Sequence, residues 1–573
     1  MSVENLLLSV TGENMTFRSS AFKKSWKLGL ILGAGLLVIA LVVLNLSGLF
    51  RSVSPVDKAH FKQFETPQIE MISSDSPFAA ATPGRHPALV QWVFNQVFRW
   101  DPQDQGPAPK NECALGPLTR QLERAQAPRE KTEIMNRYLQ DCESQFLNGE
   151  LKAHIQALRL FTMSYSIDDH PFLTRVLFHL PDGKKLKGLL AVKDQKRRPF
   201  VILRMGITGN IEEAFAERFF YYQLFERGLF NFLMVENMTG TDFIHHNRSV
   251  EFAGLAESYQ NLWIAQLLRN PQQPISKLVE SVHLVGLSLG GQGVLTSAWL
   301  SPVQKNPNLF QSFLALCPLV NLKPTFDHLF EGGGVGRLPL EVWAHSRFAE
   351  ARVFYPELFD TYFGLPGRIL KFVADHYAKP QADLFGVKEP AFLEKLNEFY
   401  ALHDLKTWDP GLRKPVWIWV TKEDSIVPVH LNSATLPQAD YLEIGVGNHC
   451  SFPAAWDGRV TQALFRGHIL GASPNFKVSK KSVQLGVPVE AAWDVDDVSV
   501  KGSTGRVEVT LISKAKFKVR FDLGLEDLDF AFSSSTLTEP EKRMIRRWLS
   551  TNLTFEASPD GSGMTVSWPF VTP

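Results

Sequence analysis

Short apolar runs alternate with helix-like segments along the middle of the chain, and this alternation limits its possible folds more than any other feature. Three of the runs are PFVILRM at 199–205, SVHLV at 281–285 and PVWIWV at 415–420. Such short runs of apolar and β-branched residues predict strands, and the segments between them have the apolar spacing of helices. Strands that are apolar on both faces predict a mostly parallel sheet with helices on both faces. We therefore expect an α/β domain over residues 161–472.

The alternation stops at residues 321–412, where a helical and aromatic insertion is predicted. The strand pattern resumes at 415–420 and again at 440–445. Parallel strands all end at one edge of their sheet, and that edge is where ligands bind. The insertion must leave the sheet there, so we expect it to form a cap over a binding site. The phenylalanines and tyrosines between 348 and 363 predict an apolar pocket under the cap.

A serine lies at the point where one predicted strand gives way to a helix. The sequence Gly-Leu-Ser-Leu-Gly places Ser288 between Gly286 and Gly290, after the strand at 281–285 and before a helix at 292–300. A strand, a Gly-x-Ser-x-Gly turn and a helix form a nucleophile elbow, which exposes the serine hydroxyl at the start of a helix. The pattern alone is weak, because about 0.2 chance matches are expected in such a chain. In the alternative interpretation, Ser288 is only a turn residue.

A nucleophilic serine needs a base, and the base needs an acceptor that orients it. Glu423 and Asp424 follow the strand at 415–420, and His449 follows the strand at 440–445. These positions put a carboxylate and an imidazole at the same edge of the predicted sheet as Ser288. A structural role is the alternative for each: His449 as a helix cap or core residue, and Asp424 as an N-cap or turn residue.

Residues 165–470 resemble the α/β-hydrolase superfamily. The motif GLSLGG is similar to the nucleophile elbow of that family, EDSIVP to its acid loop, and GNHCSF to its histidine loop, all in the family's order. The resemblance implies a catalytic triad of Ser288, Asp424 and His449. It favours Asp424 over Glu423, because the family's aspartate stands three residues before Val-Pro.

The segment RMGITGN follows the strand at 199–205 where the family has its oxyanion loop, although Met-Gly replaces the frequent His-Gly pair. The resemblance implies an oxyanion hole formed by the backbone N–H groups of Ile207 and Leu289. It implies no cofactor and no metal. His245 and His246 invite a metal interpretation, but adjacent histidines in an extended loop point apart. No carboxylate or cysteine has ligand spacing with them.

These features predict a membrane-anchored serine hydrolase that cleaves an acyl ester through an acyl-enzyme. Its substrate would be a small-molecule or lipid-like acyl compound. A peptidase or thioesterase of the same fold is one alternative. A catalytically silent scaffold or binding protein is another, although all three triad residues are present. The net charge of +1 gives no reason to expect nucleic acid. The sequence indicates no particular protein partner.

The four cysteines give one expected pair. Cys113 and Cys142 flank a polar, helix-rich segment, and a disulfide between them is expected outside the cytoplasm. Cys317 lies in an apolar run and is predicted to be a core residue. Cys450 is expected to be no more than the neighbour of His449.

The N-terminal region contains an uncharged apolar segment at 28–50. As a helix it would be about 34 Å long, enough to cross a hydrocarbon core of about 30 Å. A cleaved secretory signal and a buried core helix are the alternatives. More basic residues lie before the segment than after it, which places residues 1–27 in the cytoplasm and the catalytic domain outside. The sequence thus predicts a single-pass membrane protein.

Two further regions flank the α/β domain. Residues 56–160 are predicted to form a mainly helical extracytoplasmic region. Residues 475–573 are predicted to form a small β-rich α+β domain, because polar and apolar residues alternate strictly at 506–523. That segment is expected to be one strand or two strands with a bend, paired with 498–501 through the turn GSTG.

Overall fold

The computed structural model describes the centre of the chain and the β-sheets near its end. The described residues are 69–71, 113–146, most of 172–331 and of 400–476, and the strands between 478 and 571. The predicted membrane segment at 28–50 and the aromatic segment at 348–363 lie outside these residues, so both stay predictions. Within the described part, no helix is both long and apolar enough to pass through a bilayer.

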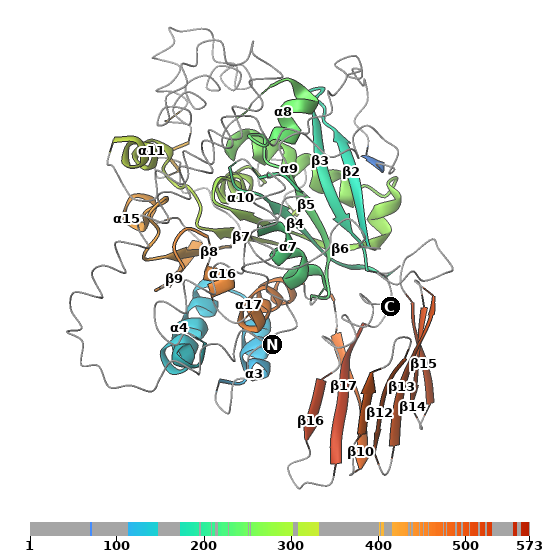
Figure 1. The fold of residues 1–573 in the computed structure, drawn as a ribbon. Coiled ribbons are helices and arrows are strands. Elements are labelled where there is room, and N and C mark those ends of the chain that lie inside the picture. The colour runs from blue at the N-terminus through green and yellow to red at the C-terminus, as the bar shows by residue number, and fades with distance from the viewer. Residues whose placement is uncertain are drawn as a thin grey trace, which may run out of the picture. The chain divides into compact units, whose positions relative to one another are not determined.

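Nine strands of the described part form one sheet (Figure 1). From one edge to the other they are β1 (Ile69–Met71), β2 (Leu173–His179), β3 (Lys185–Ala191), β5 (Asn231–Val235), β4 (Arg198–Arg204), β6 (Val279–Leu287), β7 (Ser312–Leu316), β8 (Val416–Thr421) and β9 (Ala439–Ile444). The pairs from β1 to β5 are antiparallel, and those from β5 to β9 are parallel. The predicted mostly parallel sheet is confirmed.

The order of the strands reverses at β4. The chain passes from β4 to β5 on one side of it, and then returns to β6 on the other side. In register, Leu203 of β4 pairs with Met234 of β5 and with Val285 of β6. The ends of β4 and β6 are therefore neighbours at a topological switch point, where open α/β sheets bind their ligands.

Each face of the sheet carries its own apolar core, because successive side chains of a strand point to opposite faces. Phe200 and Ile202 belong to one cluster, and Val201 and Leu203 belong to the other. The first face is covered by α9 (Gly254–Arg269) and α10 (Leu289–Leu300), and the second by α7 (Ala216–Phe220), the π-helix η4 (Tyr221–Glu226) and α17 (Gly458–Gly471) (Figure 1). Burial on both faces explains why these strands read as continuous apolar runs.

Helices α3 (Leu115–Arg124) and α4 (Pro128–Phe146) pack onto the second face. At Gly467 of α17 an added Cβ would lie 2.2 Å from Cβ of Leu122, so α3 approaches α17 closely there. The indole N–H of Trp417 on β8 donates to Thr132 Oγ1 at 3.0 Å, and Lys131 Nζ donates to the carbonyl of His468 at 3.3 Å. These two helices, predicted to lie in a separate helical region, share the core of the α/β domain.

The C-terminal part forms two antiparallel sheets. One contains β10 (Val478–Gly486), β17 (Gly563–Val571) and β16 (Thr554–Ala557), and the other contains β11 (Glu490–Trp493), β12 (Asp497–Gly502), β13 (Gly505–Ser513), β14 (Lys516–Phe521) and β15 (Gly524–Asp529). The predicted alternating segment is two strands, β13 and β14, which pair with each other. The expected pairing of β13 with β12 is present, with Val498 opposite Val509.

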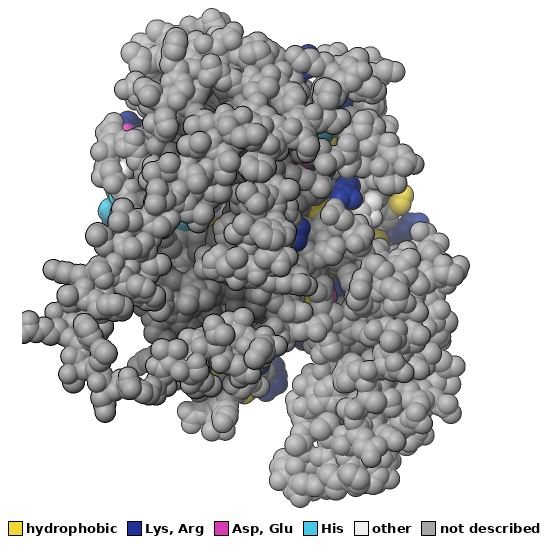
Figure 2. Space-filling view, in the orientation of Figure 1, with side chains coloured by type: hydrophobic (Ala, Val, Ile, Leu, Met, Phe, Trp, Pro, Cys, Tyr) yellow, Lys and Arg dark blue, Asp and Glu magenta, His cyan; other side chains and the backbone are white. Residues whose placement is uncertain are grey.

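Figure 2 shows one face of the molecule, where the described side chains reach the surface as small, separate patches, basic and apolar ones among them. Among the described residues, the large apolar side chain that is exposed is Tyr259, at 44%. On this face the described residues form no continuous charged or apolar surface. The chemistry-bearing side chains described next lie mainly below the surface.

Candidate active site

Ser288 lies in a sharp turn between β6 and α10. Its backbone has φ 54° and ψ −115°, a region that residues other than glycine rarely occupy. The turn leaves no space for a side chain at the glycines two residues before and two residues after Ser288. An added Cβ at Gly290 would lie 2.5 Å from the carbonyl oxygen of Met205, and one at Gly286 would lie 2.3 Å from that of Gly290. The sequence therefore needs glycine on both sides of the serine, as expected for a nucleophile elbow.

The structure brings Ser288, His449 and Asp424 together. Ser288 Oγ lies 2.9 Å from His449 Nε2, and His449 Nδ1 lies 2.8 Å from Asp424 Oδ2. The three residues come from the loops after β6, β9 and β8, at the edge where the parallel strands end. Ser288 is only 8% exposed, so this residue is largely buried. This relay can move a proton from the hydroxyl to the imidazole.

The second oxygen of the Asp424 carboxylate is held by backbone donors. The N–H groups of Ile426 and Val427 donate to Asp424 Oδ1 at 2.9 and 2.7 Å. These bonds fix the plane of the carboxylate and leave Oδ2 for the imidazole. The neighbouring Glu423 is exposed and is not part of the relay. The geometry thus selects Asp424 from the two carboxylates that the sequence offered.

Asn448 joins the acid loop to the histidine loop, a contact that sequence reasoning missed. Its side-chain Oδ1 accepts hydrogen bonds from the backbone N–H of Ser425 at 3.2 Å and from that of His449 at 2.8 Å. Its carbonyl accepts from Thr421 Oγ1 at 2.6 Å. The available signal in the sequence was an asparagine directly before the histidine, because asparagine adopts positive φ more readily than most residues, as it does here at 43°.

The predicted oxyanion donors belong to two segments that lie next to Ser288. Leu289 is the first residue of α10, and the first N–H groups of a helix have no acceptor within it. Ile207 lies in the loop after β4, directly after Gly206. An added Cβ at Gly206 would lie 3.2 Å from Cβ of Ser288, so this loop passes beside the serine. Two backbone donors at a helix start and a facing loop can stabilise a developing oxyanion.

A buried polar network lies behind the loop after β4. Asn237 Nδ2 donates to the carbonyl of Met205 at 3.1 Å and also to Glu257 Oε1, while Arg204 Nη2 donates to Gln260 Oε1 at 2.8 Å. Burial raises the pKa of Glu257 to about 7, and the charge of Arg204, 3.8 Å away, acts in the opposite direction. The network fixes the backbone at Met205, just before the predicted oxyanion loop. Its signal in the sequence was an arginine inside an apolar strand.

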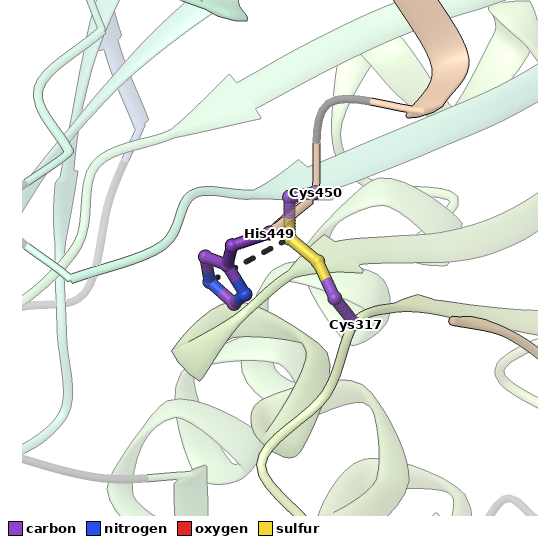
Figure 3. Close-up of side chains that lie close together, drawn as sticks. All are labelled: Cys317, His449 and Cys450. Carbon is purple, nitrogen blue, oxygen red and sulfur yellow. Dashed lines mark hydrogen bonds between the residues drawn. A yellow bond between two sulfur atoms is a disulfide. The ribbon is translucent and has the colours of Figure 1, made fainter. Parts of the chain in front are cut away.

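The cysteines form two disulfides, of which the sequence predicted one. Cys113 and Cys142 are bonded as expected, with their Cα atoms 5.6 Å apart. Cys317 is a buried core residue, as predicted, but it is also bonded to Cys450, with a Cα distance of 5.5 Å. The prediction that Cys450 is no more than the neighbour of His449 was therefore wrong. Figure 3 shows this disulfide beside the imidazole. The pairing was missed because 133 residues separate the partners and only the folded sheet brings them together.

The structure bears on metal binding at two places. Among the described residues, Cys317, His449 and Cys450 form the one group whose ligand atoms lie within metal-binding distance of one another. Metals bind cysteine as the thiolate, and sulfur atoms joined in a disulfide offer none. His245 and His246 lie in helix α8 (Thr241–Asn247), not in an extended loop as predicted. Burial lowers their pKa values to about 4 and about 3, which keeps both rings neutral.

The chain matches no protein-family model and no curated protein. Among solved structures it is similar to a 2,6-dihydroxy-pseudo-oxynicotine hydrolase, with 13% identity, a TM-score of 0.34, and 66% of this chain and 95% of that chain covered. A Pyrococcus furiosus esterase, Pf2001, has 18% identity and a TM-score of 0.30, with 53% and 95% covered. A Mycobacterium tuberculosis puromycin-hydrolyzing peptidase has 15% identity and a TM-score of 0.33, with 52% and 39% covered.

Likenesses of this size carry no argument by themselves. The assignment of the chain to the α/β-hydrolase fold rests on its own features. These are the strand order with its switch at β4, the strained elbow between β6 and α10, and the order serine, aspartate, histidine along the chain. The resemblance noted in the sequence is confirmed at the level of the fold.

Proposed function

We propose that this protein is a serine hydrolase that cleaves an acyl ester. One observation carries the proposal: the continuous relay from Ser288 Oγ through His449 to Asp424, with distances of 2.9 and 2.8 Å. The strained backbone at Ser288 supports it further, because strain of this kind persists where the surrounding structure enforces it and is concentrated at active sites. A catalytically silent scaffold would have no need of either feature.

In the proposed mechanism, Ser288 Oγ attacks the acyl carbonyl while His449 Nε2 takes the hydroxyl proton. Asp424 accepts the Nδ1–H bond, which fixes the tautomer and stabilises the imidazolium. The N–H groups of Ile207 and Leu289 stabilise the oxyanion. His449 then gives its proton to the leaving alkoxide, and the acyl group stays on Ser288. Water repeats the cycle, releasing the carboxylic acid and the free serine. No step requires a metal or cofactor.

An ester is the favoured bond because an alkoxide leaves more easily than an amine. The aromatic segment at 348–363 supports an apolar acyl group, since an insertion after β7 leaves the sheet at the edge that carries Ser288. A thioester or a peptide bond would be cleaved by the same relay, and activity on either would redefine the substrate class. The substrate we propose is a small-molecule or lipid-like acyl compound.

We also propose that the protein is anchored in a membrane by residues 28–50, with the catalytic domain outside the cytoplasm. The uncharged apolar segment and the excess of basic residues before it support this arrangement. The two disulfides are in keeping with it, since such bonds persist in oxidising compartments. Protease added outside spheroplasts should digest the catalytic domain and spare residues 1–27. Protection of the catalytic domain would contradict the proposed orientation.

The function is tested with a fluorophosphonate probe and a panel of esters, thioesters and peptide amides. The probe should label Ser288, and Ser288→Ala should abolish labelling and lower kcat by about 10⁶-fold, as loss of a nucleophile does elsewhere. Ser276→Ala is the matched control, because that hydroxyl lies on the short helix η5 (Pro274–Leu278) before β6 and bonds to the carbonyl of Gln273. Well-folded protein without labelling would favour the scaffold alternative.

A further inference from the structure

The loop that carries His449 has a costly backbone conformation. Gly447, Asn448 and Cys450 all have positive φ, of 119°, 43° and 54°. Residues other than glycine at positive φ cost energy and persist only when contacts around them enforce the conformation. The loop joins β9 to α16 (Phe452–Ala455). Contacts must hold the loop in this conformation, and those of Asn448 act on one side of His449.

On the other side of His449 the loop is held by a covalent bond. Cys450 is joined to Cys317, which directly follows the last residue of β7, Leu316. Cys317 is itself fixed, because its N–H donates to the carbonyl of Trp419 on β8 at 2.7 Å. Both cysteines are buried. The disulfide thus ties the histidine loop to the central strands of the sheet (Figure 3).

The same strand end also holds the serine. The N–H of Ser288 donates to the carbonyl of Leu316 at 2.8 Å, and Cys450 Sγ lies 3.5 Å from that carbonyl. Ser288 and His449 are therefore anchored to two consecutive residues, Leu316 and Cys317. A rigid common anchor fixes the distance between hydroxyl and imidazole, which is the distance that proton transfer depends on.

The disulfide also lies against the reacting nitrogen. Cys450 Sγ is 3.9 Å from His449 Nε2 (Figure 3). The same nitrogen lies 2.9 Å from Ser288 Oγ. A disulfide sulfur carries no proton and no charge, so it limits the ring's position without competing for the serine. Were the bond reduced, Cys450 would be a thiol beside the imidazole. Thiol and imidazole at this spacing can form a thiolate–imidazolium pair, which would occupy the base.

We propose that Cys317 and Cys450 are positioning residues for His449, and that hydrolysis requires their disulfide. This inference rests on the proposed function, because it concerns the base of that reaction. A dithiol reductant breaks the S–S bond, giving two thiols on the protein and a cyclic disulfide on the reductant. Reduction therefore lowers turnover, and reoxidation restores it. The proposal deepens the proposed function by making the oxidised state a condition for catalysis.

Two variants and one control test the proposal in the full-length protein. Cys317→Ser removes the bond and leaves a Cys450 thiol beside His449, whereas Cys450→Ser removes the bond and that thiol. Both should lower kcat by about 10²-fold, the cost of misplacing a reacting group by about 1 Å, with little change in KM. Cys317→Ser alone should also displace the acid limb of the kcat/KM profile to higher pH, because a thiolate stabilises the imidazolium. Cys113→Ser/Cys142→Ser is the matched control and should keep wild-type kcat.

The outcomes separate the two proposals. Wild-type kcat and pH profile in variants shown by mass spectrometry to lack the bond would overturn the inference and leave the serine hydrolase intact. If the variants do not fold, the Cys113→Ser/Cys142→Ser protein is reduced by dithiothreitol and monitored by circular dichroism. Reversible loss of kcat at unchanged circular dichroism supports the inference, and unchanged kcat contradicts it. Failure of the fluorophosphonate to label Ser288 in oxidised protein would contradict both proposals.

Discussion

At the scale of single residues, the proposed site uses side chains that their neighbours in the sequence cannot replace. Asp424 bonds through one oxygen to His449 and through the other to backbone N–H groups, so its carboxylate cannot turn. Glu423 is adjacent in sequence and chemically similar, but it is exposed. The two carboxylates therefore form a matched pair for testing the geometry.

Asp424→Asn should lower kcat by about 10⁴-fold, because an amide favours the wrong imidazole tautomer while keeping the shape of the side chain. Glu423→Gln should change kcat little. Steady-state ester hydrolysis by the two purified variants measures both. A large loss in Glu423→Gln with a mild effect in Asp424→Asn would show that the relay uses the other carboxylate.

Gly290→Ala should damage the elbow. The added methyl would meet the carbonyl oxygens of Met205 and Arg204 at 2.5 and 2.6 Å, and backbone atoms cannot move aside as a flexible side chain can. We expect a loss of about 1–3 kcal/mol in the free energy of unfolding, together with lower kcat, because the predicted oxyanion loop follows Met205.

Gly116→Ala is the control for this change, since its nearest neighbour is the end of the Arg120 side chain at 3.5 Å. Urea titration and steady-state kinetics measure the two effects. If Gly290→Ala were as stable and as active as Gly116→Ala, the close approach of β4 to the elbow would affect neither the free energy of unfolding nor kcat.

At the scale of elements, apolar runs predicted the central strands because those strands are buried on both faces. Polar residues inside the strands were harder to interpret. His283 is fully buried in the middle of β6, where its two ring nitrogens lie 2.8 Å from Ser312 Oγ and 2.9 Å from Ser281 Oγ and Ser473 Oγ. Burial, followed by the charges of Lys131 and Arg269, lowers its pKa to about 3.

The neutral ring at His283 predicts a specific loss of stability in acid. The unfolded chain takes up a proton near pH 6.5 while the folded chain does not until about pH 3, so the free energy of unfolding falls as pH drops below 6.5. By pH 5 the loss from this residue is about 2 kcal/mol. His283→Asn removes this titrating group. The difference in the free energy of unfolding between wild type and variant should therefore be smaller at pH 5 than at pH 7 by that amount.

Urea unfolding at the two pH values, followed by tryptophan fluorescence, measures the gap. His430→Asn serves as the control, because His430 is exposed on α15 (Val429–Asn432). A gap that stays constant between pH 7 and pH 5 would mean that His283 binds a proton in the folded protein as readily as in the unfolded chain.

Helix boundaries were predicted less well than strands. Residues 241–247 form helix α8, although the sequence suggested an extended loop, and residues 216–226 form α7 followed by a π-helix. Tertiary contacts decide such cases. The ring of Tyr221 at the start of the π-helix packs edge-on against Phe232 of β5, a contact that no local pattern reports.

At the scale of the whole molecule, the order of motifs along the chain was enough to predict the fold, and the resemblance of the acid loop favoured Asp424 as the third residue of the relay. Each motif lies at a strand end, and parallel strands end together, so distance in sequence did not matter. Contacts between loops were not predictable. The Cys317–Cys450 bond, the bridge through Asn448 and the network at Glu257 each depend on which loops are neighbours, and only the sheet order decides that. The membrane segment at 28–50 and the aromatic cap stay predictions.

The spacing of the two disulfides has a consequence for how the chain matures during synthesis. Cys113 and Cys142 are 29 residues apart, so they leave the ribosome at nearly the same time. Cys450, in contrast, is synthesised 133 residues after Cys317. Because the chain is synthesised from its N-terminus, the first disulfide can form early. Once it has formed, Cys113 and Cys142 can no longer form a wrong disulfide with Cys317. The second bond can form only after β8 and β9 have been made. A growing chain would thus stay inert until nearly the whole domain has left the ribosome.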